Sequence, residues 1–328
     1  MSEDLLRFPK WVPGAHLQTF YAALWLPTPV VAFRRERWNT PDGDFIDLDW
    51  LDGKSGALVV LFHGLEGSSR SPYARAIADA VQRRGASCVV VHFRGCSGHP
   101  NRLPRAYHSG DSAEIDWILR RLAHLCGAPV GAVGISLGAN ALLKWLGEQG
   151  VAAAQLVGAA AAVSAPLDLV AAGNALDHGF NRIYTLNFLR TLIPKSLEKL
   201  VRFPGLFDEA RLRRARSFRE FDDVVTAPVH GFDGVMDYWQ RASSKPWLAH
   251  IQVPTLLLNA RNDSFLPRTA LPAASEVSAQ VECLFPEPGG HVGFIDGSFP
   301  GTRTWLLNRI CNHVLARISG FTGVGATR

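Results

Sequence analysis

The sequence predicts an α/β fold in which a mostly parallel central sheet carries helices on both faces and a helical cap is inserted between two strands. Short apolar runs alternate with helical patterns along most of the chain, which is typical of parallel strands buried on both faces. The alternation stops between residues 164 and 251, where prolines and helix-like segments replace the apolar runs. A serine flanked by glycines, Ser136, stands where a strand passes into a helix.

The apolar runs place the strands of this sheet. Residues 33–38 and 45–50 flank the turn residues Pro41, Asp42 and Gly43, so they predict an antiparallel hairpin. Because helical patterns separate the runs that follow, these runs predict parallel strands covered by helices. They span residues 57–62, 87–93, 129–135, 156–163, 253–260 and 280–285.

These elements divide the chain into segments. We expect a first part of the core at residues 1–163, with an N-terminal arm at 1–30, and a second part at 252–320. Residues 164–251 form the helical cap, and residues 321–328 form a flexible tail. An insertion between two sheet strands lies over their carboxyl ends, where open α/β sheets bind ligands.

Composition indicates a globular protein with a large core. Of the 328 residues, 47% are hydrophobic and 19% are charged. The longest stretch of small apolar residues, 151–163, is interrupted by Gln155 and is too short to cross a bilayer, so we expect no transmembrane helix. The N-terminal sequence MSEDLLRFPKW carries acidic residues and a proline, unlike a signal peptide, and therefore favours a cytoplasmic location.

Charge and cysteine content exclude several kinds of partner. The net charge of +5 is compatible with peripheral contact to an anionic membrane, but no basic stripe interleaved with aromatic residues predicts nucleic-acid binding. The five cysteines show no C-x-x-C or Cys/His ligand spacing, so we expect a reducing compartment and neither a metal nor another cofactor. They are Cys88, Cys96, Cys126, Cys283 and Cys311.

Ser136 lies in the sequence VGAVGISLGAN, residues 130–140. The pattern G-x-S-x-G at such a junction is typical of a nucleophile elbow, in which the chain turns sharply and holds the serine hydroxyl out at the end of the sheet. Gly134 and Gly138 keep side chains out of the tight turn. The alternative is a glycine-rich turn with an inert serine, which holds only if no base and acid follow downstream.

A serine hydroxyl needs a base to remove its proton and a carboxylate to orient that base. Asp263 follows the run 255–260, and His291 follows the run 281–285, so both stand at strand ends in the order serine, acid, histidine. Taken singly, Asp263 could cap a helix and His291 could be an ordinary loop histidine. Asp168, after the strand that follows the elbow, is a second candidate for the acid.

An acyl-transfer site must also stabilise an oxyanion. The first parallel strand ends in the sequence HGLEG, residues 63–67, where a glycine-rich turn can direct a backbone N–H into the site. We therefore expect the N–H groups of Leu65 and Leu137 to form the oxyanion hole, and His63 to be structural. A phosphate-binding loop is excluded because the G-K-[ST] ending is missing.

The cap carries two further features. An aromatic and apolar stretch at residues 183–192 predicts a substrate pocket over Ser136, with Phe188 and Phe207 in its wall. A cluster of arginines could bind an anionic head group, but a solvated helix face paired with neighbouring carboxylates is favoured. The arginines are Arg211, Arg213, Arg214, Arg216 and Arg219, and the carboxylates are Asp208, Glu209 and Glu220.

Several longer strings resemble a known family. They are HLQTF (16–20), HGLEGSS (63–69), HFRGCSGHPNR (92–102), YHSGD (107–111) and FDDVVTAPVHGF (221–232). With the serine, acid and histidine, they resemble the α/β-hydrolases, and within them the YheT-like (AB hydrolase 4-type) hydrolases with their eukaryotic lipase and alcohol-acyltransferase relatives. The resemblance covers most of the chain, and only Ala139 and Ser264 depart from its usual glycine and proline.

The resemblance implies an α/β-hydrolase fold and a carboxylic-ester hydrolase for short to medium acyl chains. We expect Ser136 to form an acyl-enzyme with His291 as base and Asp263 as orienting acid, on a small-molecule or lipid-like ester. Acyl transfer to an alcohol would use the same residues. A scaffold or binding protein without turnover is disfavoured because it has no physical need for all three. The sequence leaves the oligomeric state open.

Overall fold

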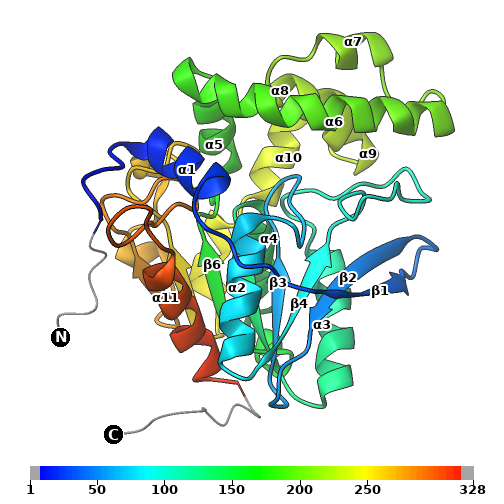
Figure 1. The fold of residues 1–328 in the computed structure, drawn as a ribbon. Helices are drawn as coiled ribbons and strands as arrows, with labels where there is room; N and C mark the ends of the chain where they lie inside the picture. Colours follow the sequence, from blue (N-terminus) through cyan, green and yellow to red (C-terminus); the bar gives the residue numbers. More distant parts are fainter. Residues whose placement is uncertain (1–7, 319–328) are drawn as a thin grey trace, which may run out of the picture.

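A computed structural model of the protein describes residues 8–318. The expected flexible tail at 321–328 and the first residues of the N-terminal arm lie outside the described residues. Within them, helix α1 (Ala15–Leu24) is the first element, and it leads to an eight-stranded sheet that forms the centre of the molecule (Figure 1).

The sheet confirms the predicted α/β fold with a mostly parallel sheet. Its strands follow one another in the spatial order β1-β2-β4-β3-β5-β6-β7-β8. The first two strands pair antiparallel, β2 pairs antiparallel with β4, and all later pairs are parallel. The strands are β1 (Arg34–Asn39), β2 (Phe45–Leu51), β3 (Leu58–Phe62), β4 (Ser87–His92), β5 (Val130–Ile135), β6 (Val157–Val163), β7 (Thr255–Leu258) and β8 (Val281–Leu284).

Helices cover both faces of the sheet because its central strands are apolar on both sides. In β3, Val60 packs into the same cluster as α3 (Ser112–Cys126) and α4 (Leu137–Gln149). Its neighbour Leu61 packs into the opposite cluster with α2 (Pro72–Arg83) and α11 (Thr304–Leu315). Successive strand residues point to opposite faces, so each strand contributes to two separate cores.

A helical insertion, here called the cap, joins β6 to β7 and lies over one end of the sheet (Figure 1). Its longest helix, α6, has 21 residues and crosses the top of the molecule. The last turn of the insertion, residues 245–250, packs on the core, since a side chain at Gly147 of α4 would meet the Trp247 carbonyl oxygen at 2.3 Å. The cap helices are α5 (Leu169–Leu176), α6 (Arg182–Arg202), α7 (Glu209–Arg214), α8 (Phe218–Phe221), α9 (Ala227–Val229) and α10 (Val235–Ala242).

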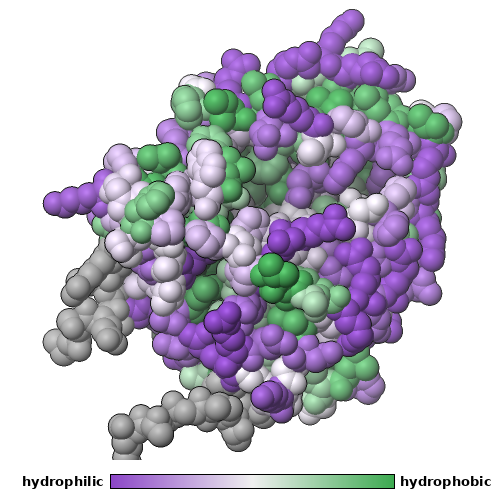
Figure 2. All heavy atoms as spheres, in the orientation of Figure 1, coloured by the Kyte–Doolittle hydropathy of each residue, from purple (hydrophilic) through white to green (hydrophobic). Residues whose placement is uncertain are grey.

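The arginine cluster lies on and beside α7, at the hydrophilic top of the view in Figure 2. Arg213 pairs with Glu209 at 2.7 Å, and Arg211 pairs with Asp223 at 2.8 Å. Asp208 caps α7 by accepting the Arg211 N–H. The geometry therefore agrees with a solvated helix face whose arginines find carboxylates nearby.

Candidate active site

Ser136 occupies the sharp turn between β5 and α4. Its backbone lies at φ 53° and ψ −118°, a region that a residue with a side chain adopts at an energetic cost. The turn is tight enough to require glycine at Gly138, where a Cβ atom would lie 2.4 Å from the Phe62 carbonyl oxygen. The elbow expected from the G-x-S-x-G pattern is thus present in the backbone.

The structure brings the three predicted catalytic side chains together. The Nε2 atom of His291 lies 2.9 Å from Ser136 Oγ, and its Nδ1 atom lies 2.9 Å from Asp263 Oδ2. Because the Asp263 carboxylate can only accept a hydrogen bond, we assign the imidazole proton to Nδ1. This tautomer leaves the Nε2 lone pair free to accept the serine hydroxyl proton.

The second candidate acid lies elsewhere. Asp168 stands before α5, and its carboxylate accepts the Ala171 N–H at 3.0 Å as a helix cap. Only Asp263 of the two candidates bonds to the His291 imidazole.

Helix α1 holds the two loops that carry the acid and the histidine. Gln18 Oε1 accepts hydrogen bonds from the Gly289 N–H and from the Asn262 side-chain amide, both at 3.0 Å. Thr19 Oγ1 accepts the N–H of His291 at 2.9 Å. Gln18 and Thr19 were not predicted as part of the site, although both lie within the string HLQTF that carries the family resemblance.

Phe265 is a third residue of the site that was not predicted from the sequence. Its ring stacks on the His291 imidazole, with centroids 3.8 Å apart and planes at 8°. Its backbone N–H donates to Asp263 Oδ1 at 2.8 Å. One residue therefore restrains both the base and the acid, and the only sequence signal was an aromatic residue two positions after Asp263.

The two expected oxyanion donors border the serine. Leu137 opens α4, so its N–H has no intrahelical partner and lies at the positive end of the helix dipole. The loop that carries Leu65 passes close to the elbow, since a Cβ at Gly64 would lie 3.1 Å from Ser136 Cβ. Within residues 8–318, neither N–H donates to another backbone or side-chain acceptor.

Hydrogen bonds with two tyrosines and a histidine hold the loop that carries Leu65. The hydroxyl of Tyr73 accepts the Gly64 N–H, and that of Tyr107 accepts the Glu66 N–H, both at 2.9 Å. His63 is fully buried, bonds to the Gly64 carbonyl oxygen through Nδ1 at 2.7 Å and accepts the Phe93 N–H through Nε2. Burial lowers the pKa of His63 to about 3, so the ring is neutral. This geometry fits the structural role expected for it.

Comparison with known proteins identifies the family to which this chain belongs. The family model described as "alpha/beta hydrolase fold" matches residues 57–298. The chain belongs to the α/β-hydrolase family. The predicted α/β-hydrolase fold is thereby confirmed. The relatives described next confirm the resemblance to YheT-like hydrolases.

Relatives of this α/β-hydrolase cover most of its length. "Putative esterase YheT" of Escherichia coli (strain K12) is 41% identical over 304 residues, 90% of this chain and 89% of the relative. Phospholipase ABHD3 of Mus musculus is 30% identical over 308 residues, 90% of this chain and 74% of the relative. The solved structure of the Pyrococcus furiosus esterase Pf2001 aligns with a TM-score of 0.57 at 16% identity, covering 89% of this chain and 98% of that one, and so supports the fold.

A small apolar cavity of this α/β-hydrolase opens at Ser136. Its volume is about 90 Å³, and the cap supplies most of its wall, including Phe188. Phe265 also lines it, so the ring that stacks on His291 faces the cavity. Phe207 packs instead against the cluster between α6 and α7 and is not among the residues that line this cavity. The prediction for Phe207 is therefore corrected, because its ring is used to hold the cap helices together.

The described residues also bear on two further features, metal-binding clusters and membrane-spanning helices. Within residues 8–318, no three His, Cys, Asp or Glu side chains are placed to hold a metal ion. None of the helices described there combines the length and apolar composition that a membrane span requires.

Proposed function

We propose that this α/β-hydrolase is a cytoplasmic serine carboxylesterase that cleaves small-molecule or lipid-like esters of short to medium acyl chains through an acyl-enzyme. The hydrogen-bonded chain from Ser136 through His291 to Asp263 carries the proposal, with both links at 2.9 Å. The names of its relatives, an esterase and a phospholipase, belong to enzymes that act on ester bonds. The small apolar cavity at Ser136 supports a short or medium acyl chain.

The proposed reaction begins with a proton transfer. His291 Nε2 takes the proton of Ser136 as Oγ attacks the ester carbonyl carbon, and the N–H groups of Leu65 and Leu137 stabilise the resulting oxyanion. The imidazolium then gives its proton to the alcohol oxygen as the ester C–O bond breaks. A water molecule attacks the acyl-enzyme with His291 again as base, and the acid leaves as Ser136 recovers its proton.

A fluorophosphonate probe tests this proposal because an activated serine attacks its phosphorus centre. We expect one covalent adduct on Ser136, located by peptide mass spectrometry, and turnover of 4-nitrophenyl esters of graded chain length. Ser136→Ala should lose both, while the control Ser275→Ala, at an exposed serine, should keep both.

Two outcomes would overturn parts of the proposal. A folded protein that never reacts with the probe, or an adduct that persists in Ser136→Ala, would contradict the catalytic assignment. The same ester panel in the presence of ethanol separates hydrolysis from acyl transfer. Ethyl ester as the main product would show that alcohol, rather than water, is the preferred acceptor.

A further inference from the structure

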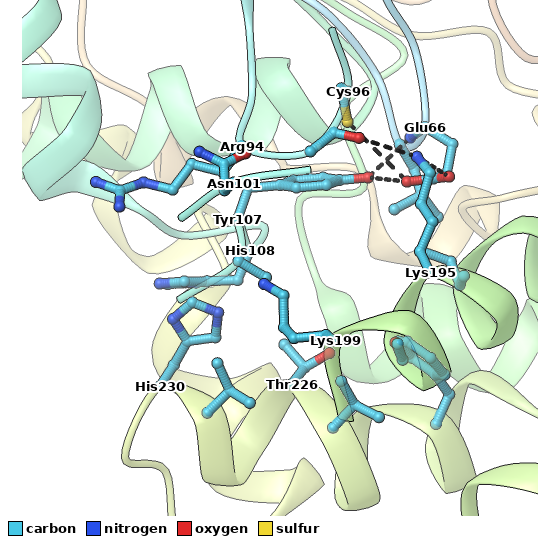
Figure 3. Close-up of a pocket in the computed structure, with 18 of the residues that line it drawn as sticks. Glu66, Arg94, Cys96, Asn101, Tyr107, His108, Lys195, Lys199, Thr226 and His230 are labelled. Carbon is cyan, nitrogen blue, oxygen red and sulfur yellow. Dashed lines mark hydrogen bonds and ion pairs between the residues drawn. The ribbon is translucent and has the colours of Figure 1, made fainter. Parts of the chain in front are cut away.

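A second and larger cavity lies beside the apolar one, between the loop 94–109 and helix α6 of the cap (Figure 3). Its volume is about 390 Å³. The two cavities share Leu65 and Leu137, whose N–H groups are the proposed oxyanion donors. Four cationic side chains line the larger cavity: Arg94, Lys195, Lys199 and Arg202.

Two of these cations are neutralised by carboxylates. Arg94 pairs with Glu114 at 2.6 Å and with Asp42 at 2.8 Å, behind the cavity wall. Lys195 pairs with Glu66 at 2.7 Å, and this contact joins α6 to the loop that carries Leu65 (Figure 3).

Lys199 differs because its partners are neutral. Its Nζ atom donates to the carbonyl oxygens of Pro104 at 2.8 Å and Arg105 at 3.1 Å, which uses two of its three N–H groups. Among residues 8–318, no carboxylate forms an ion pair with this ammonium group. Burial lowers the pKa of Lys199 to about 8, because the nearby carboxylate of Asp44 offsets only part of the cost of burying this cation.

Two histidines beside Lys199 add polar groups to the same wall. The rings of His108 and His230 lie 4.5 Å apart, and Lys199 extends toward His108 in Figure 3. His108 Nδ1 accepts the Gly110 N–H, so its proton is on Nε2. His230 Nε2 is buried without a hydrogen-bond partner among the described residues. Buried polar atoms are normally paired, so this wall is suited to a polar ligand.

The remaining carboxylates of the cavity wall do not form ion pairs with the Lys199 ammonium group. Asp222 accepts hydrogen bonds from Thr226 at 2.6 Å and Trp239 at 2.8 Å, and among residues 8–318 it forms no ion pair with Lys199. Glu198 also lines the cavity, but it forms no ion pair with Lys199. Arg202 donates to the carbonyl oxygens of Asn101 and Arg102, so it too remains a cation without a carboxylate partner.

We propose that the larger cavity binds the alcohol half of the ester, and that this alcohol carries an anionic group, a carboxylate or a phosphate, bound by Lys199. The inference rests on the proposed function. A scissile carbonyl held between Leu65 and Leu137 places its acyl chain in the apolar cavity with Ser136. Its alcohol then enters the cationic cavity on the other side of the same wall.

Matched esters test the proposal. One pair is 1-butanoylglycerol and its 3-phosphate, and the other is 3-butanoyloxypropanoate and its amide, so each pair differs only in the anionic group. We expect kcat/KM to be at least about tenfold higher for the anionic member, the size of one hydrogen bond to a charged group. The preferred pair identifies the group as phosphate or carboxylate.

Two substitutions at Lys199 separate charge from hydrogen bonding. Lys199→Met removes both, whereas Lys199→Gln keeps a donor for the carbonyls of Pro104 and Arg105. In each variant the ratio of kcat/KM between anionic and neutral ester should fall at least about fivefold, with folding checked by circular dichroism. Arg190→Met removes an exposed cation from the same helix and should leave the ratio unchanged.

The outcomes distinguish this inference from the proposed function. An equal rate for both members of each pair, or a ratio unaffected in Lys199→Gln, would overturn the inference alone. If none of the four esters is hydrolysed, the fluorophosphonate and 4-nitrophenyl ester assays decide the proposed function, and binding still tests the cavity. Calorimetry with Ser136→Ala should then detect glycerol 3-phosphate or 3-hydroxypropanoate but not glycerol. Loss of that binding in Ser136→Ala/Lys199→Gln supports an anion site at Lys199, and persistence of the binding refutes this site.

Discussion

At the scale of single residues, the environment of each carboxylate decides its role. Asp263 is 6% exposed and bonds to the imidazole of His291 at 2.9 Å. Asp168 also follows a parallel strand, but its carboxylate is occupied by the first turn of α5. Sequence position placed both residues at strand ends, and only side-chain direction separates them.

Substitution of the two aspartates should therefore have unequal effects. In Asp263→Asn the amide stabilises the wrong imidazole tautomer, and kcat should fall by an amount on the order of 10⁴, as for the same change in a serine protease. Asp168→Asn should cost less than about tenfold, because asparagine caps a helix as well as aspartate does. Ester turnover of both folded variants measures this, and the reverse ranking would move the acid to Asp168.

The cavity wall allows a second comparison between residues of one type. Phe188→Ala should alter the chain-length profile, with kcat/KM falling more for octanoate than for acetate esters, because its ring lines the cavity at Ser136. Phe207→Ala should lower the stability of the cap, by about 3 kcal/mol at most, with less effect on the profile. Equal losses on all esters in Phe188→Ala would indicate destabilisation rather than a lost pocket wall.

At the scale of elements, the strands could be predicted closely and helix α1 could not. Each strand from β3 to β8 coincides with an apolar run, because burial on both faces of a sheet demands continuous hydrophobicity. The contribution of α1 depends on the polar side chains of Gln18 and Thr19, whose partners lie 244 to 272 positions away in the sequence. Hydrophobic patterns carry no information about such bonds.

Gln18 provides the test of this element. Gln18→Ala removes the acceptor shared by Gly289 and Asn262, so we expect kcat to fall by about tenfold or more while KM changes little. Gln18→Glu keeps an acceptor for both donors and should recover much of the activity. Leu24→Ala, at an exposed position on the same helix, is the control and should behave as wild type. An unchanged kcat in Gln18→Ala would show that the loops are held without α1.

At the scale of the whole molecule, buried neutral histidines link stability to pH. His63 has a folded pKa of about 3, below the unfolded value of about 6.5. Between these values the unfolded chain binds a proton that the folded protein excludes. The free energy of unfolding should therefore fall as pH drops below about 6.5, by up to about 1.4 kcal/mol per pH unit for this group.

Denaturant titrations of wild type and His63→Gln at pH 7, 6 and 5 measure this contribution. The variant should be less stable at pH 7. Its free energy of unfolding should also change less with pH, by up to about 1.4 kcal/mol per pH unit, the slope that one proton contributes. Because the other buried groups titrate in both proteins, the difference isolates His63. Parallel pH profiles would contradict the burial of a neutral ring at this position.

The contacts of α1 also have a consequence for the order of events during synthesis. The ribosome releases Gln18 and Thr19 long before the residues at 262 and 289–291 that they hold. Ser136 and its elbow can form early, but the base and acid loops reach their places only when residues 262–291 pack against α1. A nascent chain that lacks residues 262–291 thus carries a serine without its base and acid, and hydrolysis starts only after these residues have been made.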